Sequence, residues 1–251
     1  MQRYFIANEQ LINNTITLHS DDAHHVKNVM RFRIGDNIIC TNENEQTFKC
    51  EILELNSDMV KVRIIEELKE DRELPVKVTI AQGMPKGEKL ELVLQKGTEL
   101  GLTSYIPLKT KRTIVKFDDK KEKKKIERWE KILKEAAEQS YRSKIPTIES
   151  PMNLKELVSF SSEYTYKLVA YEETAKKSEE KSNLKYVLNN VNNGDSILAV
   201  FGPEGGLDED EVSFLEKNGF ITCALGPRIL RTETAPLYLL SAVSYQLELL
   251  R

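Results

Sequence analysis

The sequence has little cysteine and histidine, and neither is placed for the chemistry it usually carries. The three cysteines (Cys40, Cys50 and Cys223) are too few and too widely spaced for a disulfide framework or a zinc site. All three histidines lie within the first 25 residues. Ser-His-Asp hydrolysis, histidine-dependent metal sites and histidine general-base chemistry are therefore excluded from the rest of the chain, and no metal is expected there.

Long hydrophobic runs and nucleotide fingerprints are also missing. No stretch approaches 18 uncharged apolar residues, so we expect no membrane span. The first residues, MQRYFIANEQ, lack the basic-then-apolar pattern of a secretion signal, which favours a cytoplasmic protein. The chain contains no GxxxxGK[ST] and no GxGxxG, so nucleoside-triphosphate and Rossmann dinucleotide sites lack their signatures.

The formal net charge of −3 hides an uneven distribution. Residues 109–134 contain 12 Lys and Arg against 5 Asp and Glu, whereas residues 1–75 contain 9 against 14. The basic segment is either a solvated helix face with a basic loop or a surface that contacts phosphates. Charge alone favours the solvated face.

With 251 residues the chain is long enough for two domains. Residues 1–70 predict short strands: NTITLHS and MVKVRIIEEL alternate in polarity, and GDNIICTNENEQTFKCEILELN predicts a hairpin. We therefore predict a small β-barrel over residues 1–72, followed by the linker KEDRELPV.

One helix is predicted within this barrel, over DDAHHVKNVMRF. Its apolar residues Ala23, Val26, Val29 and Met30 recur at helical spacing. One of the nearby aspartates, Asp21 or Asp22, is the predicted N-terminal cap.

The pattern changes after residue 76 to strands that alternate with helices. The predicted strands are VKVTIAQ, TSYIPL, YKLVAYE, SILAVF and ITCALG. The predicted helices are GEKLELVLQKGTELG, a long one from about Lys121 to Arg142, NLKYVLNNV and LYLLSAVSYQLELL. This alternation predicts an α/β domain over residues 73–251, with a parallel sheet covered by helices on both faces.

A glycine-bearing loop, FGPEGGLDEDEV, follows the strand SILAVF directly. Ligands bind at the carboxyl ends of strands in such sheets, and Gly202, Gly205 and Gly206 allow a close backbone approach. The next helix opens with acidic residues, which stabilise the helix dipole but repel a phosphate. The loop therefore suits a neutral or cationic ligand such as S-adenosylmethionine, whose sulfonium is positive; the alternative is a tight turn without a ligand.

A second loop, ALGPRILRTETAPLYLL, follows the strand ITCALG and leads into the terminal helix, with Thr234 as its predicted cap. Its charged residues are either a surface ion pair or part of a pocket. Because two Gly-Pro loops follow two successive strands, we favour two walls of one pocket.

These two loops carry a family resemblance. GPEGG followed by LGPRILRTETA resembles the paired signature of the 16S rRNA uracil-N3 methyltransferase family, within the SPOUT superfamily. QGMPKGEKLELVLQKGTELG, ERWEKILKEAAEQSYRSKIPTI and HHVKNVMRFRIGD are similar to further segments of that family, in the same order. The similarity extends from about residue 1 to residue 250.

The resemblance implies a fold and a reaction. The N-terminal domain would be a PUA-like, RNA-binding β-barrel, and the C-terminal domain a SPOUT fold with a deep trefoil knot. The protein would be a homodimer that uses S-adenosylmethionine to methylate N3 of a uridine in the decoding region of 16S rRNA, within the small ribosomal subunit. No DNA or membrane partner is implied.

The resemblance also implies where the methyl donor binds: between the loop after YKLVAYE, the GPEGG loop and the LGPRILRTETA loop. The residues expected to bind it are Tyr171, Phe201, Gly202, Pro203, Glu204, Gly205, Gly206, Leu225, Gly226, Ile229, Leu230, Arg231, Thr232 and Thr234.

Roles in the reaction follow from chemistry at these positions. Arg231 is the first candidate to stabilise the negative charge that develops on the uracil carbonyl oxygen. Glu204 and Glu233 are candidates to orient the base or the arginine, or to accept the N3 proton. The residues expected to contact RNA are Arg3, Lys27, Arg31, Arg33, Lys86, Lys96, Lys111 and Arg112.

Three alternatives stay open on the sequence. A SPOUT enzyme that methylates a ribose 2′-oxygen of tRNA or rRNA would share the fold and the donor. A non-catalytic RNA-binding protein would keep the barrel but would not need both loops. A nucleotide-dependent oxidoreductase would require the missing fingerprint.

Overall fold

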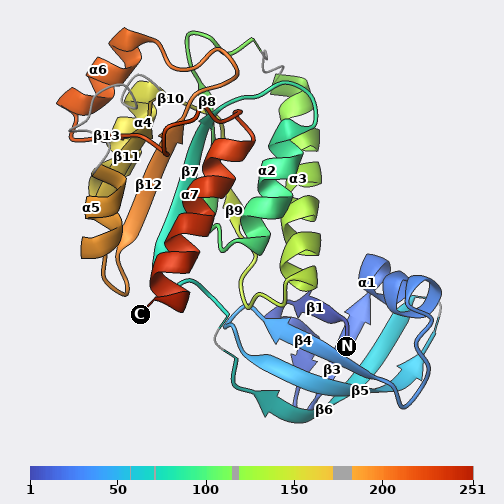
Figure 1. The fold of residues 1–251 in the computed structure, drawn as a ribbon. Helices are drawn as coiled ribbons and strands as arrows, with labels where there is room; N and C mark the ends of the chain where they lie inside the picture. The colour runs from blue at the N-terminus through green and yellow to red at the C-terminus, as the bar shows by residue number, and fades with distance from the viewer. Residues whose placement is uncertain (57, 71, 115–118, 172–182, 251) are drawn as a thin grey trace. The chain divides into compact units, whose positions relative to one another are not determined.

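The computed structural model describes residues 1–56, 58–70, 72–114, 119–171 and 183–250, and for residues 119–121 it describes only the backbone. The chain divides into two units (Figure 1). The smaller unit contains Met1–Glu73 and Ala137–Lys144, and the larger unit contains Leu74–Ala136 and Ile145–Arg251.

The smaller unit is built on a six-stranded sheet with the order β1-β4-β5-β6-β3-β2. Its strands are β1 (Arg3–Ile6), β2 (Leu11–Ile12), β3 (Thr15–His19), β4 (Asn37–Asn42), β5 (Thr47–Leu55) and β6 (Met59–Leu68). All pairings are antiparallel except that of β1 with β4. The predicted alternation places side chains such as Ile16 and Leu18 in a buried core.

The predicted helix of this unit is shorter than the pattern suggested. It consists of α1 (Ser20–His24) and a π-helical turn, η2 (His25–Val29). Ala23 and Val26 are buried as predicted, but Val29 and Met30 are exposed because the helix ends there. The predicted cap was wrong: His19 occupies the N-cap position without a side-chain hydrogen bond, and both aspartates lie in the first turn.

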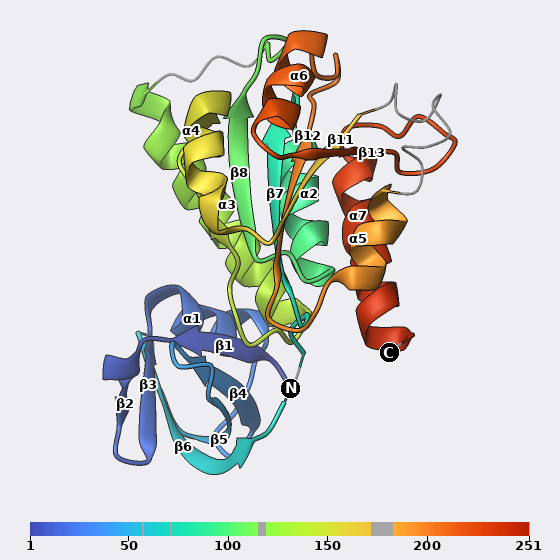
Figure 2. The ribbon, with the colours of Figure 1, turned by 90° about the vertical axis from the view of Figure 1, so that its left-hand side faces the viewer.

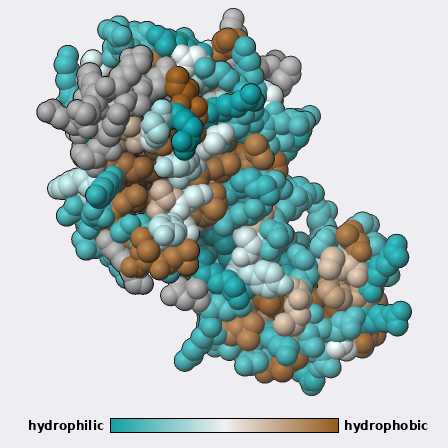
Figure 3. Space-filling view, in the orientation of Figure 1, coloured by the Kyte–Doolittle hydropathy of each residue, from teal (hydrophilic) through white to brown (hydrophobic). Residues whose placement is uncertain are grey.

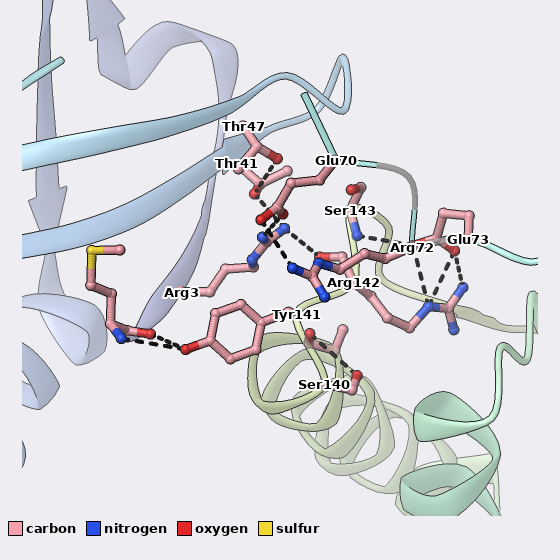
Figure 4. A network of polar contacts seen from close by, with 12 residues as sticks. Arg3, Thr41, Thr47, Glu70, Arg72, Glu73, Ser140, Tyr141, Arg142 and Ser143 are labelled. Atoms are coloured by element: carbon pink, nitrogen blue, oxygen red, sulfur yellow. Dashed lines mark hydrogen bonds and ion pairs between the residues drawn. The ribbon is translucent and has the colours of Figure 1, made fainter. Parts of the chain in front are cut away.

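A polar network joins the segment Ala137–Lys144 to the rest of the smaller unit (Figure 4). The Arg3 guanidinium pairs with Glu70 and donates to Thr41 Oγ1 at 3.2 Å and to the Arg142 carbonyl at 2.9 Å. The Arg142 side chain pairs in turn with Glu73. Arg3 is completely buried, so this network lies inside the unit.

The larger unit contains a seven-stranded sheet with the order β10-β8-β7-β12-β11-β13, in which β9 also pairs with β8. Its strands are β7 (Lys77–Gly83), β8 (Ser104–Lys109), β9 (Thr147–Ile148), β10 (Met152–Asn153), β11 (Tyr166–Ala170), β12 (Ser196–Phe201) and β13 (Ile221–Cys223). Every pairing between these strands is parallel, which confirms the predicted sheet.

Helices cover both faces of this sheet, as predicted (Figures 1 and 2). The helices are α2 (Lys89–Glu99), α3 (Asp119–Gln139), α4 (Leu154–Phe160), α5 (Asn183–Asn190), α6 (Glu209–Lys217) and α7 (Thr234–Ser244), the last continued by η6 (Tyr245–Leu249). Alternate strand residues point to opposite faces: Ile80 and Phe201 pack with α2, α3, α5 and α7, and Ala81 and Val200 pack with α4 and α6.

Two predicted helix ends are corrected by the structure. The long helix was expected to reach about Arg142 but ends at Gln139, close to Tyr141, whose φ of 60° is not helical. Thr234 is the first helical residue of α7, and Glu233 occupies the N-cap position. None of the described helices is long and apolar enough to cross a membrane.

Candidate functional site

A cavity of about 420 Å³ opens at the carboxyl ends of β11, β12 and β13. It is lined by Lys89, Ala170, Tyr171, Phe201, Gly202, Pro203, Glu204, Gly206, Leu207, Cys223, Ala224, Leu225, Gly226, Arg228, Ile229, Leu230, Arg231, Thr232 and Ala235. Three strand-end segments contribute: the end of β11, the GPEGG loop after β12, and the loop of residues 224–233 after β13. The second and third are loops that the family resemblance implied, whereas the implied loop after YKLVAYE lies outside the described residues.

Glycines allow the GPEGG loop to turn back sharply at the end of β12. A Cβ on Gly202 would lie 2.6 Å from the carbonyl carbon of Gly206, and Gly206 itself has a φ of 71°. The loop also lies against the end of β7, where a Cβ on Gly83 would lie 2.5 Å from Pro203 Cδ. Only glycine fits these close approaches, which fix the position of the loop.

The start of α6, directly after the GPEGG loop, is already neutralised by basic residues. Asp208 caps the helix by accepting a hydrogen bond from the backbone N–H of Asp210. Lys111 Nζ lies 2.8 Å from carboxylate oxygens of both aspartates. Its hydrogen bond is the main cause that lowers the pKa of Asp208. Lys111, Asp208 and Asp210 are therefore paired with one another.

The loop of residues 224–233 is tied to the GPEGG loop. Thr232 Oγ1 donates to the Gly202 carbonyl oxygen at 2.9 Å. At the end of this loop, the backbone N–H groups of Thr234 and Ala235 donate to the Arg231 carbonyl oxygen. The two loops that the sequence suggested as walls of one pocket therefore touch each other.

Charged residues gather at one side of the cavity. Lys89 Nζ lies 3.0 Å from Glu204 Oε1 and 3.6 Å from Glu233 Oε2. Burial raises the pKa of Glu204, but the backbone N–H of Lys86 and the Lys89 ammonium outweigh it, so that the pKa is lowered overall. The hydrogen bond to Glu204 raises the pKa of Lys89. The pair therefore stays charged at neutral pH.

The predicted donor-binding residues line this cavity with the exceptions of Gly205 and Thr234. Arg231 lines it with an exposed side chain, and Glu204 lies at its charged side. Glu233 does not line the cavity itself; its Oε2 is buried and accepts no hydrogen bond from the described residues.

Sequence reasoning missed Lys89 and the apolar residues Ala170, Leu207, Cys223, Ala224 and Ala235, and it did not assign Arg228 to donor binding. Lys89 lies at the start of α2, shortly after β7, so its segment follows the carboxyl end of another parallel strand. The strand-end rule that found the other loops would have found it too.

The predicted RNA-contacting residues have different environments. The prediction that Arg3 contacts RNA was wrong, because its side chain is completely buried in the network with Glu70 and cannot reach a ligand. Lys111 and Arg112 pair with Asp208, and Lys96 pairs with Glu99. Arg31, Arg33, Lys86, Lys111 and Arg112 are exposed, and Lys27 and Lys96 are half-buried.

The chain is similar to known RNA methyltransferases. The sequence profile of an RNA methyltransferase domain matches residues 72–244, and that of an RNA methyltransferase PUA domain matches residues 18–65. Together with the parallel sheet and its strand-end cavity, these matches define an RNA methyltransferase with an N-terminal PUA domain.

Relatives matched over nearly their full length identify the family within this class of RNA methyltransferases. The chain is 50% identical to "Ribosomal RNA small subunit methyltransferase E" of Bacillus subtilis (strain 168), over 100% of this chain and 99% of that protein. A solved protein with the same name from Neisseria gonorrhoeae, bound to S-adenosyl methionine, is 28% identical, with a TM-score of 0.83 over 97% of each chain. A putative methyltransferase from Legionella pneumophila, solved with S-adenosylmethionine, is 32% identical, with a TM-score of 0.84 over 96% of each chain. The chain belongs to the ribosomal RNA small subunit methyltransferase E family, and the predicted family is confirmed.

Proposed function

We propose that the chain transfers a methyl group from S-adenosylmethionine to N3 of a uridine in the decoding region of 16S rRNA. The observation that carries this proposal is the convergence of two strand-end loops and the end of β11 on one cavity beside a basic and acidic cluster. Relatives of the same length are named as small-subunit rRNA methyltransferases, and two solved relatives hold the donor. Since ribosomal RNA is the proposed substrate, we also propose a cytoplasmic location.

The cavity fits the chemistry of the donor. Its lining is largely apolar, which suits an adenosine and a methylene chain, and the paired charges of Lys89 and Glu204 lie at one side. The sulfonium methyl is electrophilic without a metal. The protein has to position the reactants, exclude water and take up the N3 proton.

Arg231, Glu204 and Glu233 are the proposed catalytic residues. The exposed Arg231 guanidinium would stabilise the negative charge that develops on a uracil carbonyl oxygen. Glu204 is a weakened proton acceptor because Lys86 and Lys89 lower the pKa of its carboxyl group. Glu233 Oε2 accepts no hydrogen bond from the described residues but lies 3.6 Å from Lys89 Nζ, so both carboxylates are proposed as acceptors. In the proposed step N3 gives its proton to one of these two carboxylates and forms a bond to the methyl carbon, and the breaking C–S bond leaves its electrons on sulfur.

A homodimer is proposed from the surface of the C-terminal helix. Apolar side chains gather over α7 and the C-terminal end of the chain in Figure 3. Tyr238, Tyr245, Leu249 and Leu250 are exposed by 42%, 56%, 73% and 58%. Exposed side chains of this kind on one helix fit a surface that packs against a second copy of the chain.

The trefoil knot and the domain roles are also proposed. The chain leaves β13 at one edge of the sheet, yet Thr232 contacts Gln82 on β7, which lies further inside; this return path is consistent with a knot.

We assign RNA binding to the PUA-like domain over residues 1–72, with Arg31 and Arg33 as exposed contacts. Methyl transfer is assigned to the domain over residues 73–251.

Nucleoside mass spectrometry of rRNA from a deletion strain tests the proposal. Loss of 3-methyluridine, restored by the wild-type chain but not by Arg231→Ala, is the expected result. Loss of a 2′-O-methylated nucleoside instead would assign the ribose as the target. An unchanged profile, together with no binding of S-adenosylmethionine in calorimetry, would point to a non-catalytic RNA-binding protein.

A further inference from the structure

Two buried polar side chains lie on adjacent strands beneath the cavity. Gln82, on β7, and Tyr105, on β8, are both completely buried. The strand register pairs Ile80 with Tyr105 and Gln82 with Pro107, so the two polar side chains are diagonal neighbours on one face of the sheet. Buried polar groups are costly unless they are hydrogen-bonded, so their partners are informative.

The hydrogen bonds of Gln82 can run in only one direction. Gln82 Nε2 lies 2.7 Å from the carbonyl oxygen of Thr232 and 2.8 Å from its Oγ1. A carbonyl oxygen only accepts, so the amide nitrogen must face Thr232 and the amide oxygen must face away. The Tyr105 hydroxyl donates to that amide oxygen at 2.9 Å, which holds the amide in this orientation.

The chain of hydrogen bonds continues into the second pocket loop. Thr232 Oγ1 accepts one N–H of Gln82, so its own hydrogen is left to donate to the Gly202 carbonyl oxygen, 2.9 Å away. Every donor in the series therefore has an acceptor, from Tyr105 through Gln82 and Thr232 to Gly202. Thr232 and Gly202 both line the cavity, one in each loop.

We propose that Tyr105 and Gln82 are positioning residues for the methyl donor, which hold the GPEGG loop and the loop of residues 224–233 at the separation that the donor requires. The inference rests on the proposed function, in which this cavity binds S-adenosylmethionine. If this series is broken, each loop gains conformational freedom that donor binding must then remove, so affinity falls. The chemical step, which involves none of these side chains, changes little once the donor is bound.

The primary test compares two tyrosine hydroxyls that both contact β7. Tyr105→Phe removes the hydroxyl that orients Gln82. Tyr164→Phe removes a hydroxyl that donates to Thr79 Oγ1 at 3.0 Å and, among the described residues, is not hydrogen-bonded to either pocket loop. Calorimetry should show the Kd of S-adenosylmethionine raised about tenfold by Tyr105→Phe and less than about twofold by Tyr164→Phe, because about tenfold corresponds to the loss of one buried hydrogen bond. The kcat at saturating donor should stay within about twofold of wild type in both.

Gln82 provides a second comparison that does not depend on Tyr105. Gln82→Met keeps the length of the side chain but removes its hydrogen bonds and should weaken binding about tenfold, whereas Thr79→Val, on the same strand, should retain the wild-type Kd. A purely structural role would instead lower the melting temperature and leave the Kd of the folded fraction unchanged, which would overturn the inference.

Hydrogen exchange separates failure of this inference from failure of the proposed function. Without any ligand, backbone amides of residues 202–206 and 224–233 should exchange faster in Tyr105→Phe than in Tyr164→Phe. Equal exchange in the two variants overturns the positioning role even if the wild type binds the donor. A wild type that binds no S-adenosylmethionine refutes the proposed function, while the exchange result still decides whether the two loops are coupled.

Discussion

Lys89 and Glu204, separated by 115 positions in the chain, form an ion pair at the cavity with Nζ and Oε1 3.0 Å apart. The same ammonium lies 3.6 Å from Glu233, so one lysine on α2 connects the GPEGG loop with the start of α7. Both carboxylates belong to the segments proposed to bind the donor and to take up the N3 proton. Because Lys89 contacts both carboxylates, its substitution should change the charge balance of the whole site.

Removing Lys89 should shift the acid limb of the pH profile. Because the pKa of Glu204 is lowered in the folded protein, its ion pair is present above the ordinary carboxyl pKa and is lost only as the pH falls through the lowered value. In Lys89→Met the pKa of Glu204 should rise, so kcat/KM should begin to fall at a higher pH than in wild type. Lys96→Met, which removes a lysine paired with Glu99 on the same helix, should leave the profile unchanged.

Arg231→Ala should reduce turnover far more than donor binding. If the guanidinium stabilises developing charge on the uracil, kcat should fall about 100-fold, as for the loss of one charge-stabilising donor, while the Kd of S-adenosylmethionine changes less than about threefold. Arg231→Lys should be intermediate because it keeps the charge without the planar fork. Methyl transfer to 16S rRNA and calorimetry measure the two quantities; an equal loss of both would assign Arg231 to the cofactor pocket.

Gly83→Ala should displace the GPEGG loop without touching the cavity directly. The new Cβ would meet Pro203 Cδ at 2.5 Å and Pro203 N at 2.8 Å, and neither atom can move without the loop. We expect donor affinity to fall by about tenfold or more and stability to fall by about 1–3 kcal/mol, as for overpacking. Gly205→Ala is the matched control, because the three atoms nearest to its Cβ would be Arg112 side-chain atoms, at 3.3 Å or more. Similar affinities for the two variants would contradict the proposed fit of the loop.

Arg3→Met should destabilise the smaller unit by about 1–3 kcal/mol, because it removes the buried donor to Thr41 Oγ1 and to the Arg142 carbonyl, while Glu70 keeps its pair with Arg72. The exposed pair of Arg63 and Glu51 provides a control, and Arg63→Met should cost at most about 1 kcal/mol. Urea denaturation followed by circular dichroism measures both. If Arg3→Met instead keeps full stability and loses RNA binding, then the assignment of Arg3 to a structural network is wrong.

The sequence by itself determined the class of the larger unit and the position of its site. Strands such as SILAVF are continuously apolar because both sheet faces are covered, and that pattern, alternating with helical stripes, predicts a parallel sheet. Parallel strands place their carboxyl ends at one edge, so the order of strands and glycine-bearing loops along the chain is enough to assign both loops to one pocket. Short stretches of sequence were enough for these predictions, because the polarity pattern of a strand and the glycines of the loop after it lie close together in the chain.

Only the tertiary structure decided which distant side chains meet. Arg3 looked like a surface cation, but it is buried against Glu70 and the carbonyl of Arg142, which comes from a segment far along the chain. Neither the contact of Lys89 with Glu204 nor the series from Tyr105 to Gly202 has a local signature. These contacts depend on the order of strands in the sheet and on the path of the loops, which side-chain periodicity does not encode.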